Sequence, residues 1–140
     1  MDIAITGGSG RLGKILTRLL LQHGNHVRSL DWTKTDPALP EEPGLQRIQI
    51  DLKDLDALTV AVQGRQALVH LAAILDPEAH PVGVGYANNT IISYNVLQAA
   101  ATLGIKKVCL ASSINAIGGA RSRRGRYDYF PVDEKHPTYT

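Results

Sequence analysis

Four glycines within the first thirteen residues have a spacing that favours binding of an anion. Residues 6–13 read Thr-Gly-Gly-Ser-Gly-Arg-Leu-Gly and follow a short apolar stretch that ends at Ile5. Glycines let the backbone turn sharply and approach a ligand closely, and a helix that begins there offers free N–H groups to a pyrophosphate. An ordinary glycine-rich turn is the less favoured alternative, because this motif closes a strand and opens a helix.

The carboxylate of Asp31 is the second group with a candidate chemical role. It ends residues 26–31, which read as the second strand. At that place an acidic residue accepts hydrogen bonds from the hydroxyls of a ribose. The alternative is a surface carboxylate that begins the proline-rich loop over residues 33–44.

Strands and helices that alternate along the chain must position these groups. Further strands are expected at 47–50, 67–72 and 107–111, and helices from Leu12 to about Gly24, from Asp54 to about Val62 and over 86–103. One apolar face of the first helix is expected to consist of Leu12, Ile15, Leu16, Leu19 and Leu20. Strands that alternate with helices predict right-handed crossovers and a parallel α/β sheet.

Length and composition exclude several classes of protein. One domain is expected from 140 residues, and a single cysteine excludes a disulfide framework and fits a cytoplasmic setting. No apolar run is long enough for a membrane helix, and the first residues do not read as a signal peptide. A net charge of +2 and 5% aromatic residues give no support to nucleic-acid binding. The five histidines show no metal-ligand spacing, so no metal is expected.

Taken in order, these segments resemble the extended, epimerase/dehydratase branch of the short-chain dehydrogenase/reductase superfamily. The glycine loop is similar to that family's Thr-Gly-x-x-Gly-x-x-Gly. Four later segments also resemble family motifs, namely Asp51-Leu52, His70 to Ala73, Asn88 to Thr90 and Leu110 to Gly118. The resemblance implies a Rossmann-type doubly wound sheet with strand order 3-2-1-4-5, truncated after the fifth strand, in an NAD(P)-binding domain over residues 1–140.

The resemblance also implies a cofactor, a substrate class and site residues. NAD is the expected cofactor, with NADP less favoured, and the expected small-molecule substrate is a sugar, uronic acid or similar polyol. Ser113 matches the catalytic serine or threonine that holds the reacting oxygen. The implied cofactor-binding residues are Gly7, Gly8, Ser9, Gly10, Arg11, Leu12, Gly13, Asp31, Asp51, Leu52, Leu71, Ala72, Ala73, Asn89, Ala111 and Ser112.

The sequence departs from the family in its acid/base motif. None of its five tyrosines has a lysine four residues later, so the catalytic Tyr-x-x-x-Lys helix is absent. The chain is therefore expected to supply the cofactor-binding half of such an enzyme and to be inactive by itself. The alternatives are a non-catalytic dinucleotide-binding or sensing module, and a structural subunit that another chain completes.

Three weaker signals complete the expectations. Arginines crowd the loop after Ser113 at Arg121, Arg123, Arg124 and Arg126. A solvated loop is favoured for them over a site for an anionic substrate, and nucleic-acid binding is the poorest alternative. His70 is expected in or near the core with satisfied ring nitrogens, and Cys109 as a small buried hydrophobe. A sheet that stops at the fifth strand would leave an open edge, so self-association is expected.

Overall fold

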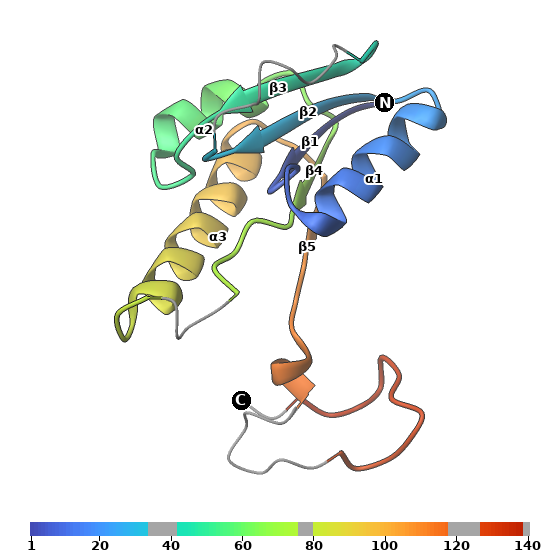
Figure 1. The fold of residues 1–140 in the computed structure, drawn as a ribbon, viewed down its shortest axis with the longest axis vertical. Coiled ribbons are helices and arrows are strands. Elements are labelled where there is room, and N and C mark those ends of the chain that lie inside the picture. The colour runs from blue at the N-terminus through green and yellow to red at the C-terminus, as the bar shows by residue number, and fades with distance from the viewer. Residues whose placement is uncertain (34–41, 76–79, 118–126, 139–140) are drawn as a thin grey trace. The chain divides into compact units, whose positions relative to one another are not determined.

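Short strands alternate with helices to form one parallel sheet, as the sequence predicts. The computed structural model describes residues 1–33, 42–75, 80–117 and 127–138. The elements are β1 (Asp2–Thr6), α1 (Arg11–Gln22), β2 (His26–Asp31), β3 (Leu45–Gln49), α2 (Leu55–Val62), β4 (Ala67–His70), α3 (Val84–Thr102), β5 (Lys107–Leu110) and a 3₁₀ helix, η1 (Ile114–Ile117). The strand order is β3-β2-β1-β4-β5, with every neighbouring pair parallel, which confirms the predicted topology (Figure 1).

Helices cover the two faces of the sheet (Figure 1). On one face, α1 packs Leu16, Leu20 and Leu21 over Ile3, Ile5 and Val27. On the other, α2 and α3 pack over Ala4, Leu30 and Leu68. The start of α2 is capped by a side chain: the Asp54 carboxylate accepts a hydrogen bond from the Ala57 N–H at 2.9 Å.

The predicted apolar face of α1 is only partly its buried face. Leu16 and Leu20 do pack on the sheet, but Leu12, Ile15 and Leu19 are 59%, 61% and 49% exposed. The buried residues of α1 are instead Gly13 and Thr17, which are smaller. The predicted helix is confirmed, and three of these five positions face solvent. The apolar stripe is wider than the face that one sheet can cover.

Cys109 is exposed, so the prediction of a buried thiol is wrong. Cys109 pairs with Val69 in the β4–β5 register, and Val69 belongs to the face that α1 covers. The helix that packs on that face is α1, and it lies mainly over β1 and β2. The thiol lies beyond these strands, on β5 at the edge of the sheet.

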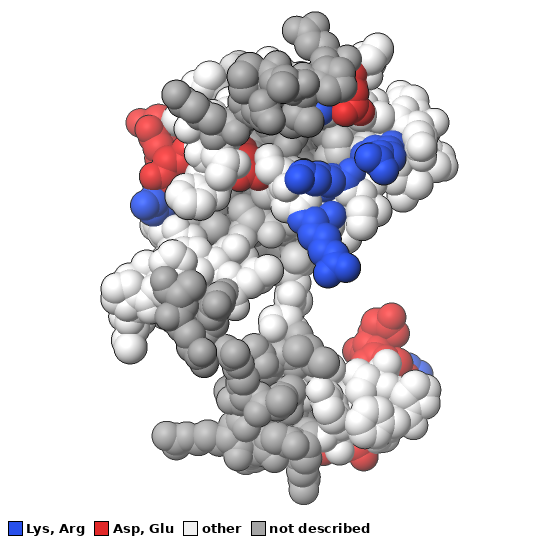
Figure 2. Space-filling model, in the orientation of Figure 1, with Lys and Arg blue, Asp and Glu red and all other residues white. Residues whose placement is uncertain are grey.

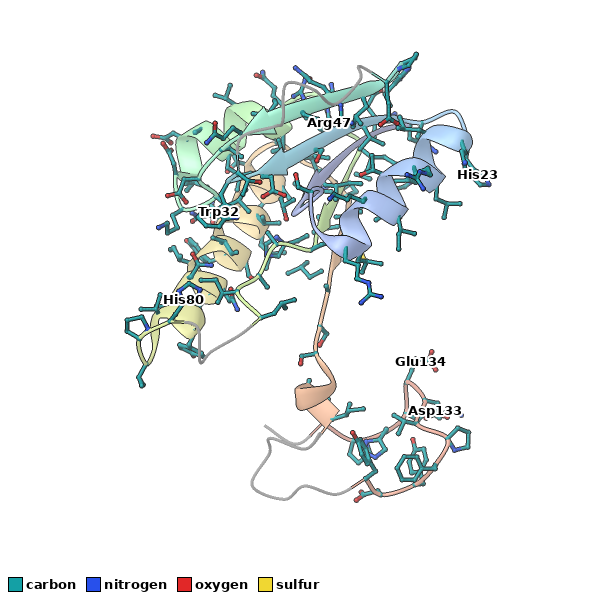
Figure 3. The ribbon with its side chains drawn as sticks, viewed as in Figure 1. His23, Trp32, Arg47, His80, Asp133 and Glu134 are labelled. Carbon is teal, nitrogen blue, oxygen red and sulfur yellow. The ribbon has the colours of Figure 1, made fainter. Side chains whose placement is uncertain are left out.

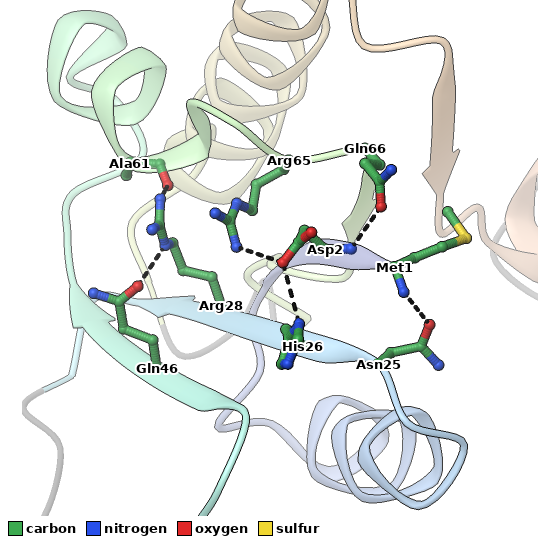
Figure 4. Close-up of polar contacts among 9 residues, drawn as sticks. All are labelled: Met1, Asp2, Asn25, His26, Arg28, Gln46, Ala61, Arg65 and Gln66. Atoms are coloured by element: carbon green, nitrogen blue, oxygen red, sulfur yellow. Dashed lines mark hydrogen bonds and ion pairs between the residues drawn. The ribbon is translucent and has the colours of Figure 1, made fainter.

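Polar contacts at the amino edge of the sheet fix the strand starts (Figure 4). The Asp2 N–H donates to Gln66 Oε1 at 2.9 Å, and the Asp2 carboxylate lies 3.4 Å from His26 Nδ1 and 3.6 Å from Arg65 Nη1. Arg28 donates to the Ala61 carbonyl at 2.6 Å, which satisfies an acceptor near the end of α2. This edge is thus stabilised by local pairing and lies at the opposite end of the strands from the glycine loop.

The chain divides into two compact units, Met1–Leu110 and Ala111–Thr140. In the second, an aromatic cluster forms around His136, which is 5% exposed. His136 Nε2 accepts a hydrogen bond from the Asp128 N–H at 3.0 Å, and Nδ1 lies 2.9 Å from the Pro137 carbonyl.

The described residues contain no helix that is both long enough and apolar enough to cross a bilayer.

Candidate functional site

The carboxyl ends of three neighbouring strands bring the predicted site segments together. β1 lies between β2 and β4 in the sheet. Because all three strands are parallel, the glycine loop after Thr6, the carboxylate of Asp31 and the segment after His70 meet at one edge. The chain leaves β1 for β2 and β3 on one side and returns to β4 on the other, so this edge is a topological switch point, where open α/β sheets bind ligands.

Two glycines of the loop are required by close approach of the backbone. Gly7 has a φ of 72°, and a Cβ there would lie 2.7 Å from the Ala72 nitrogen. A Cβ at Gly13 would collide with the Gly7 carbonyl and the Gly8 backbone. The loop therefore fits tightly between the end of β4 and the first turn of α1. The glycine at position 10 is different, since a Cβ there would meet only the Gly7 oxygen, at 3.1 Å.

The amino end of α1 presents backbone donors without a side-chain cap. Gly10 is the N-cap residue, it makes no side-chain cap hydrogen bond, and the first turn contains no acidic residue. The first N–H groups of a helix have no partner within it, and the helix dipole adds partial positive charge at the same place. Arg11, Lys14 and Arg18 are all exposed on this helix, and Figure 2 shows basic side chains gathered over it. This end of α1 is suited to a phosphate group.

Asp31 lies beside the loop and is already hydrogen bonded to it. Its Oδ2 accepts from the Ser9 N–H at 2.9 Å, and its Oδ1 accepts from the Trp32 N–H at 2.9 Å. Trp32 itself is 77% exposed and follows directly after β2 (Figure 3). The carboxylate therefore holds the loop and the end of β2 together, and retains further acceptor capacity for a ligand hydroxyl.

A buried asparagine that the sequence analysis missed fixes the Asp51-Leu52 turn. Asn95 on α3 is 3% exposed, and its Nδ2 donates to the carbonyls of Leu52 and Lys53 at 3.0 and 2.9 Å. Leu52 is buried in the core, whereas Asp51 is exposed and its Oδ1 accepts from the Lys53 N–H at 3.0 Å. The signal in the sequence was the place of Asn95 beside Val96, among the apolar residues of the long helix.

Asn89 holds the chain that follows β4. Its side-chain oxygen accepts from the Ile74 N–H at 2.8 Å, and its Nδ2 donates to the Ile74 carbonyl at 2.9 Å. Leu71 and Ala72 are partly buried and Ala73 is exposed. The predicted residues of this segment thus form an extended tail at the edge of the site, anchored to α3 at its far end.

A buried polar chain underlies the same tail. His70 is 4% exposed, its Nδ1 lies 2.6 Å from Thr6 Oγ1, and its Nε2 lies 3.2 Å from Ser93 Oγ. Burial lowers the pKa of His70 below its usual range, which favours the neutral ring. The prediction of a core histidine with satisfied ring nitrogens is confirmed. Its partners, on β1 and α3, were not foreseen.

The remaining predicted residues lie in the second unit. Ala111, Ser112 and Ser113 are exposed there, and Ser113 precedes η1, with its carbonyl accepting from the Ala116 N–H at 3.0 Å. Their assigned roles stay predictions. The four clustered arginines fall outside the described residues.

A tyrosine of the second unit is poorly suited to act as a base. Tyr129 Oη donates to Asp133 Oδ1 at 2.6 Å, and this hydrogen bond is the main cause that raises the pKa of Tyr129 to about 12. Asp133 and Glu134 lie on the same loop (Figure 3). A tyrosine that works near neutral pH needs its pKa lowered, not raised.

The first unit has the features that a dinucleotide requires. The Gly7 and Gly13 contacts leave no room for side chains, the N-cap at Gly10 is open, and a carboxylate stands at the end of β2. In the dinucleotide-binding fold these three features serve the tight turn, the pyrophosphate and the ribose.

Comparisons with known proteins agree with this geometry. Residues 3–139 match the NAD dependent epimerase/dehydratase family. The chain is 34% identical over 111 residues to an L-arabinose 1-dehydrogenase (NAD(P)(+)) of Haloferax volcanii, which covers 79% of this chain and 40% of that protein. It is 28% identical over 139 residues to a 3 beta-hydroxysteroid dehydrogenase/Delta 5-->4-isomerase of Mycobacterium tuberculosis, covering 95% of this chain and 37% of that protein.

Solved structures give the same result. Uronate dehydrogenase from Agrobacterium tumefaciens, a point mutant complexed with NAD, superposes with a TM-score of 0.72 at 30% identity, covering 84% of this chain and 42% of that one. The Bordetella bronchiseptica enzyme WbmG in complex with NAD superposes with a TM-score of 0.77 at 29% identity, covering 99% and 44%. The chain therefore spans less than half the length of these relatives.

Proposed function

This chain belongs to the NAD dependent epimerase/dehydratase family, and from that premise we propose that residues 1–140 form the cofactor-binding domain of an NAD-dependent oxidoreductase or epimerase/dehydratase. The proposed substrate is a sugar, a uronic acid or a similar polyol. Two of the relatives named above support this class, a dehydrogenase of arabinose and one of uronate, whereas a third is a steroid dehydrogenase. The observation that carries the proposal is the glycine loop, held against Ala72 with the open amino end of α1 beside it.

Each part of the first unit has a defined task in this proposal. The N–H groups at the start of α1 bind the pyrophosphate, with Gly10 leaving room for its approach. Asp31 accepts hydrogen bonds from the ribose diol, and its negative charge disfavours a 2′-phosphate. The Asp51-Leu52 turn lines the adenine, and the Leu71–Ala73 tail and Asn89 line the path toward the nicotinamide. Bound NAD supplies a hydride acceptor at the nicotinamide ring.

Ser113 is proposed to orient the substrate oxygen that loses or gains a proton. A serine hydroxyl is by itself a weak base near neutral pH, so Ser113 is proposed to orient this oxygen and not to take its proton. The hydrogen bond to Asp133 raises the pKa of Tyr129, which makes it a poor replacement for the family's acid/base tyrosine. We therefore propose that the 140-residue chain binds NAD and has no turnover of its own, with self-association as a further property.

A second candidate is a dinucleotide-binding module with no catalytic task. Both candidates predict the same cofactor site and differ only in the chemistry that follows binding.

Titration of the 140-residue chain with NAD and NADP tests the proposal. Trp32 is the single tryptophan and follows Asp31, so its fluorescence reports ligand binding beside β2. Saturable binding of NAD, tighter than that of NADP, is expected; no binding of either would refute the proposal. Reduction of NAD with a panel of aldoses and uronic acids then separates the candidates. Turnover by this chain that is lost in Ser113→Ala would show that the acid/base group lies within these residues.

A further inference from the structure

A chain of hydrogen bonds runs beneath the candidate site and joins three separate elements. It passes from Ser93 on α3 to His70 at the end of β4, and from there to Thr6 at the end of β1. It ends at the backbone N–H of Ala72, which lies 3.4 Å from Thr6 Oγ1. Thr6 is fully buried and His70 is 4% exposed, so solvent does not compete for these groups.

The direction of each hydrogen bond follows from the groups available. The Ala72 N–H can only donate, so Thr6 Oγ1 accepts it. We infer that the Thr6 hydroxyl directs its own proton to His70 Nδ1, 2.6 Å away. A neutral imidazole with an acceptor at Nδ1 carries its proton on Nε2. That proton is donated to Ser93 Oγ at 3.2 Å. In this arrangement the Ala72 N–H, the Thr6 hydroxyl and the His70 Nε2–H each donate one hydrogen bond.

The end of this chain coincides with the tightest contact of the glycine loop. The Ala72 nitrogen is the atom that a Cβ at Gly7 would meet at 2.7 Å. The Leu71 N–H also donates to the Thr6 carbonyl, at 3.1 Å. Thr6 therefore holds the start of the Leu71–Ala73 tail through both its backbone and its side chain, directly beside the loop.

We propose that His70 is a positioning residue: it orients the Thr6 hydroxyl, which fixes the Ala72 amide and so holds the Leu71–Ala73 tail against the glycine loop in the geometry that binds the dinucleotide. The effect on NAD affinity rests on the proposed function, whereas the hydrogen-bond chain itself does not. A ring that offered a proton at Nδ1 would leave the Thr6 hydroxyl without this acceptor and free it to rotate.

Paired substitutions separate this role from a general contribution to packing. Thr6→Val and His70→Leu remove the chain with little change in shape, while Thr6→Ser keeps the hydroxyl and His70→Asn places an oxygen near Nδ1. Val96→Ala is the matched control, since Val96 is a fully buried core residue of α3 outside the chain. We expect the first pair to weaken NAD binding about fivefold to tenfold, the value of one buried hydrogen bond. The second pair and Val96→Ala should stay within about twofold of the parent chain.

Nuclear magnetic resonance of the free chain provides a readout that needs no ligand. The nitrogen-15 spectrum of the His70 ring should show the proton on Nε2, and Thr6→Val should shift the Ala72 amide signal. Where Thr6→Val or His70→Leu does not fold, Ser93→Ala takes their place, with an expected shift of the His70 Nε2 signal.

The outcomes distinguish the two proposals. No binding of NAD by the parent chain would refute the proposed function, and the ring spectrum would still decide whether the hydrogen-bond chain exists. Binding by the parent chain, with unchanged affinity in folded Thr6→Val and His70→Leu, would overturn only the role of His70. A proton on Nδ1 in the free chain would overturn it as well.

Discussion

Replacement of Asp31 by asparagine should reverse the balance between NAD and NADP. Both carboxylate oxygens already accept backbone N–H groups, Oδ2 from Ser9 and Oδ1 from Trp32, each at 2.9 Å. An asparagine has one acceptor oxygen and one amide nitrogen, so one of those two N–H groups must face a donor. The substitution therefore removes the negative charge to which the ribose hydroxyls would donate. It also weakens one of the two hydrogen bonds from the Ser9 and Trp32 N–H groups.

A charge-assisted hydrogen bond contributes about 1.5–3 kcal/mol, which corresponds to about a tenfold to hundredfold change in affinity. We expect Asp31→Asn to weaken NAD binding by that factor, while NADP binding changes little or improves because a repulsive charge is lost. The assay is calorimetric titration of both cofactors, supported by Trp32 fluorescence. Asp56→Asn on α2, an exposed site with the same change in charge, is the control. Tighter NADP than NAD binding by the parent chain, or unchanged NAD affinity in Asp31→Asn, would refute the assignment of Asp31.

Three further predictions concern the loop, the buried histidine and the surface of α1. Gly13→Ala should lower the free energy of unfolding by about 1–3 kcal/mol, because its Cβ collides with the loop backbone. Gly10→Ala should instead weaken NAD binding with little loss of stability. Thermal unfolding measures the stability of both variants, and titration measures their NAD affinity. Burial lowers the pKa of His70 in the folded chain, so the folded state is not penalised above pH 6.5, about the pKa of histidine in the unfolded chain. As the pH falls below that value, the unfolded chain takes up a proton first and the free energy of unfolding decreases. Urea unfolding at several pH values should show a smaller decrease in His70→Asn. Ile15→Lys with Leu19→Lys should reduce self-association measured by light scattering, and a parent chain that is monomeric at high concentration would contradict this.

Local patterns in the sequence were sufficient for the order and direction of the strands. The bounds of β2 match the expected 26–31, and Asp54 caps α2 as expected. The fourth strand ends at His70 rather than at residue 72, because the next two residues leave the ladder to contact Thr6. Periodicity could not predict which face of a helix or strand the other elements cover. Leu12, Ile15 and Leu19 of the apolar stripe of α1 and the thiol of Cys109 are exposed, because burial depends on which other elements pack there.

The candidate site was predictable to the extent that it is local in sequence. The glycine loop and Asp31 lie where the motif placed them, and the structure adds their direct hydrogen bond across 22 positions. The supporting contacts could not be predicted from spacing. Thr6 and His70 are 64 positions apart, and Asn95 reaches a turn more than 40 positions before it. Such contacts are set by how α3 lies on the sheet, which no single stretch of residues specifies.

Because Cys109 is exposed, the reactivity of its thiol can report whether another segment or molecule packs over β5. It is the only thiol in the sequence and lies on the edge strand, on the face that α1 leaves open at β5. A thiol-specific reagent should therefore modify each molecule once, at a rate set by access to that face. Any segment, second copy or other protein that packs over β5 should slow the reaction in proportion to the time it stays bound. The rate of thiol labelling would therefore measure this association without any substitution in the chain.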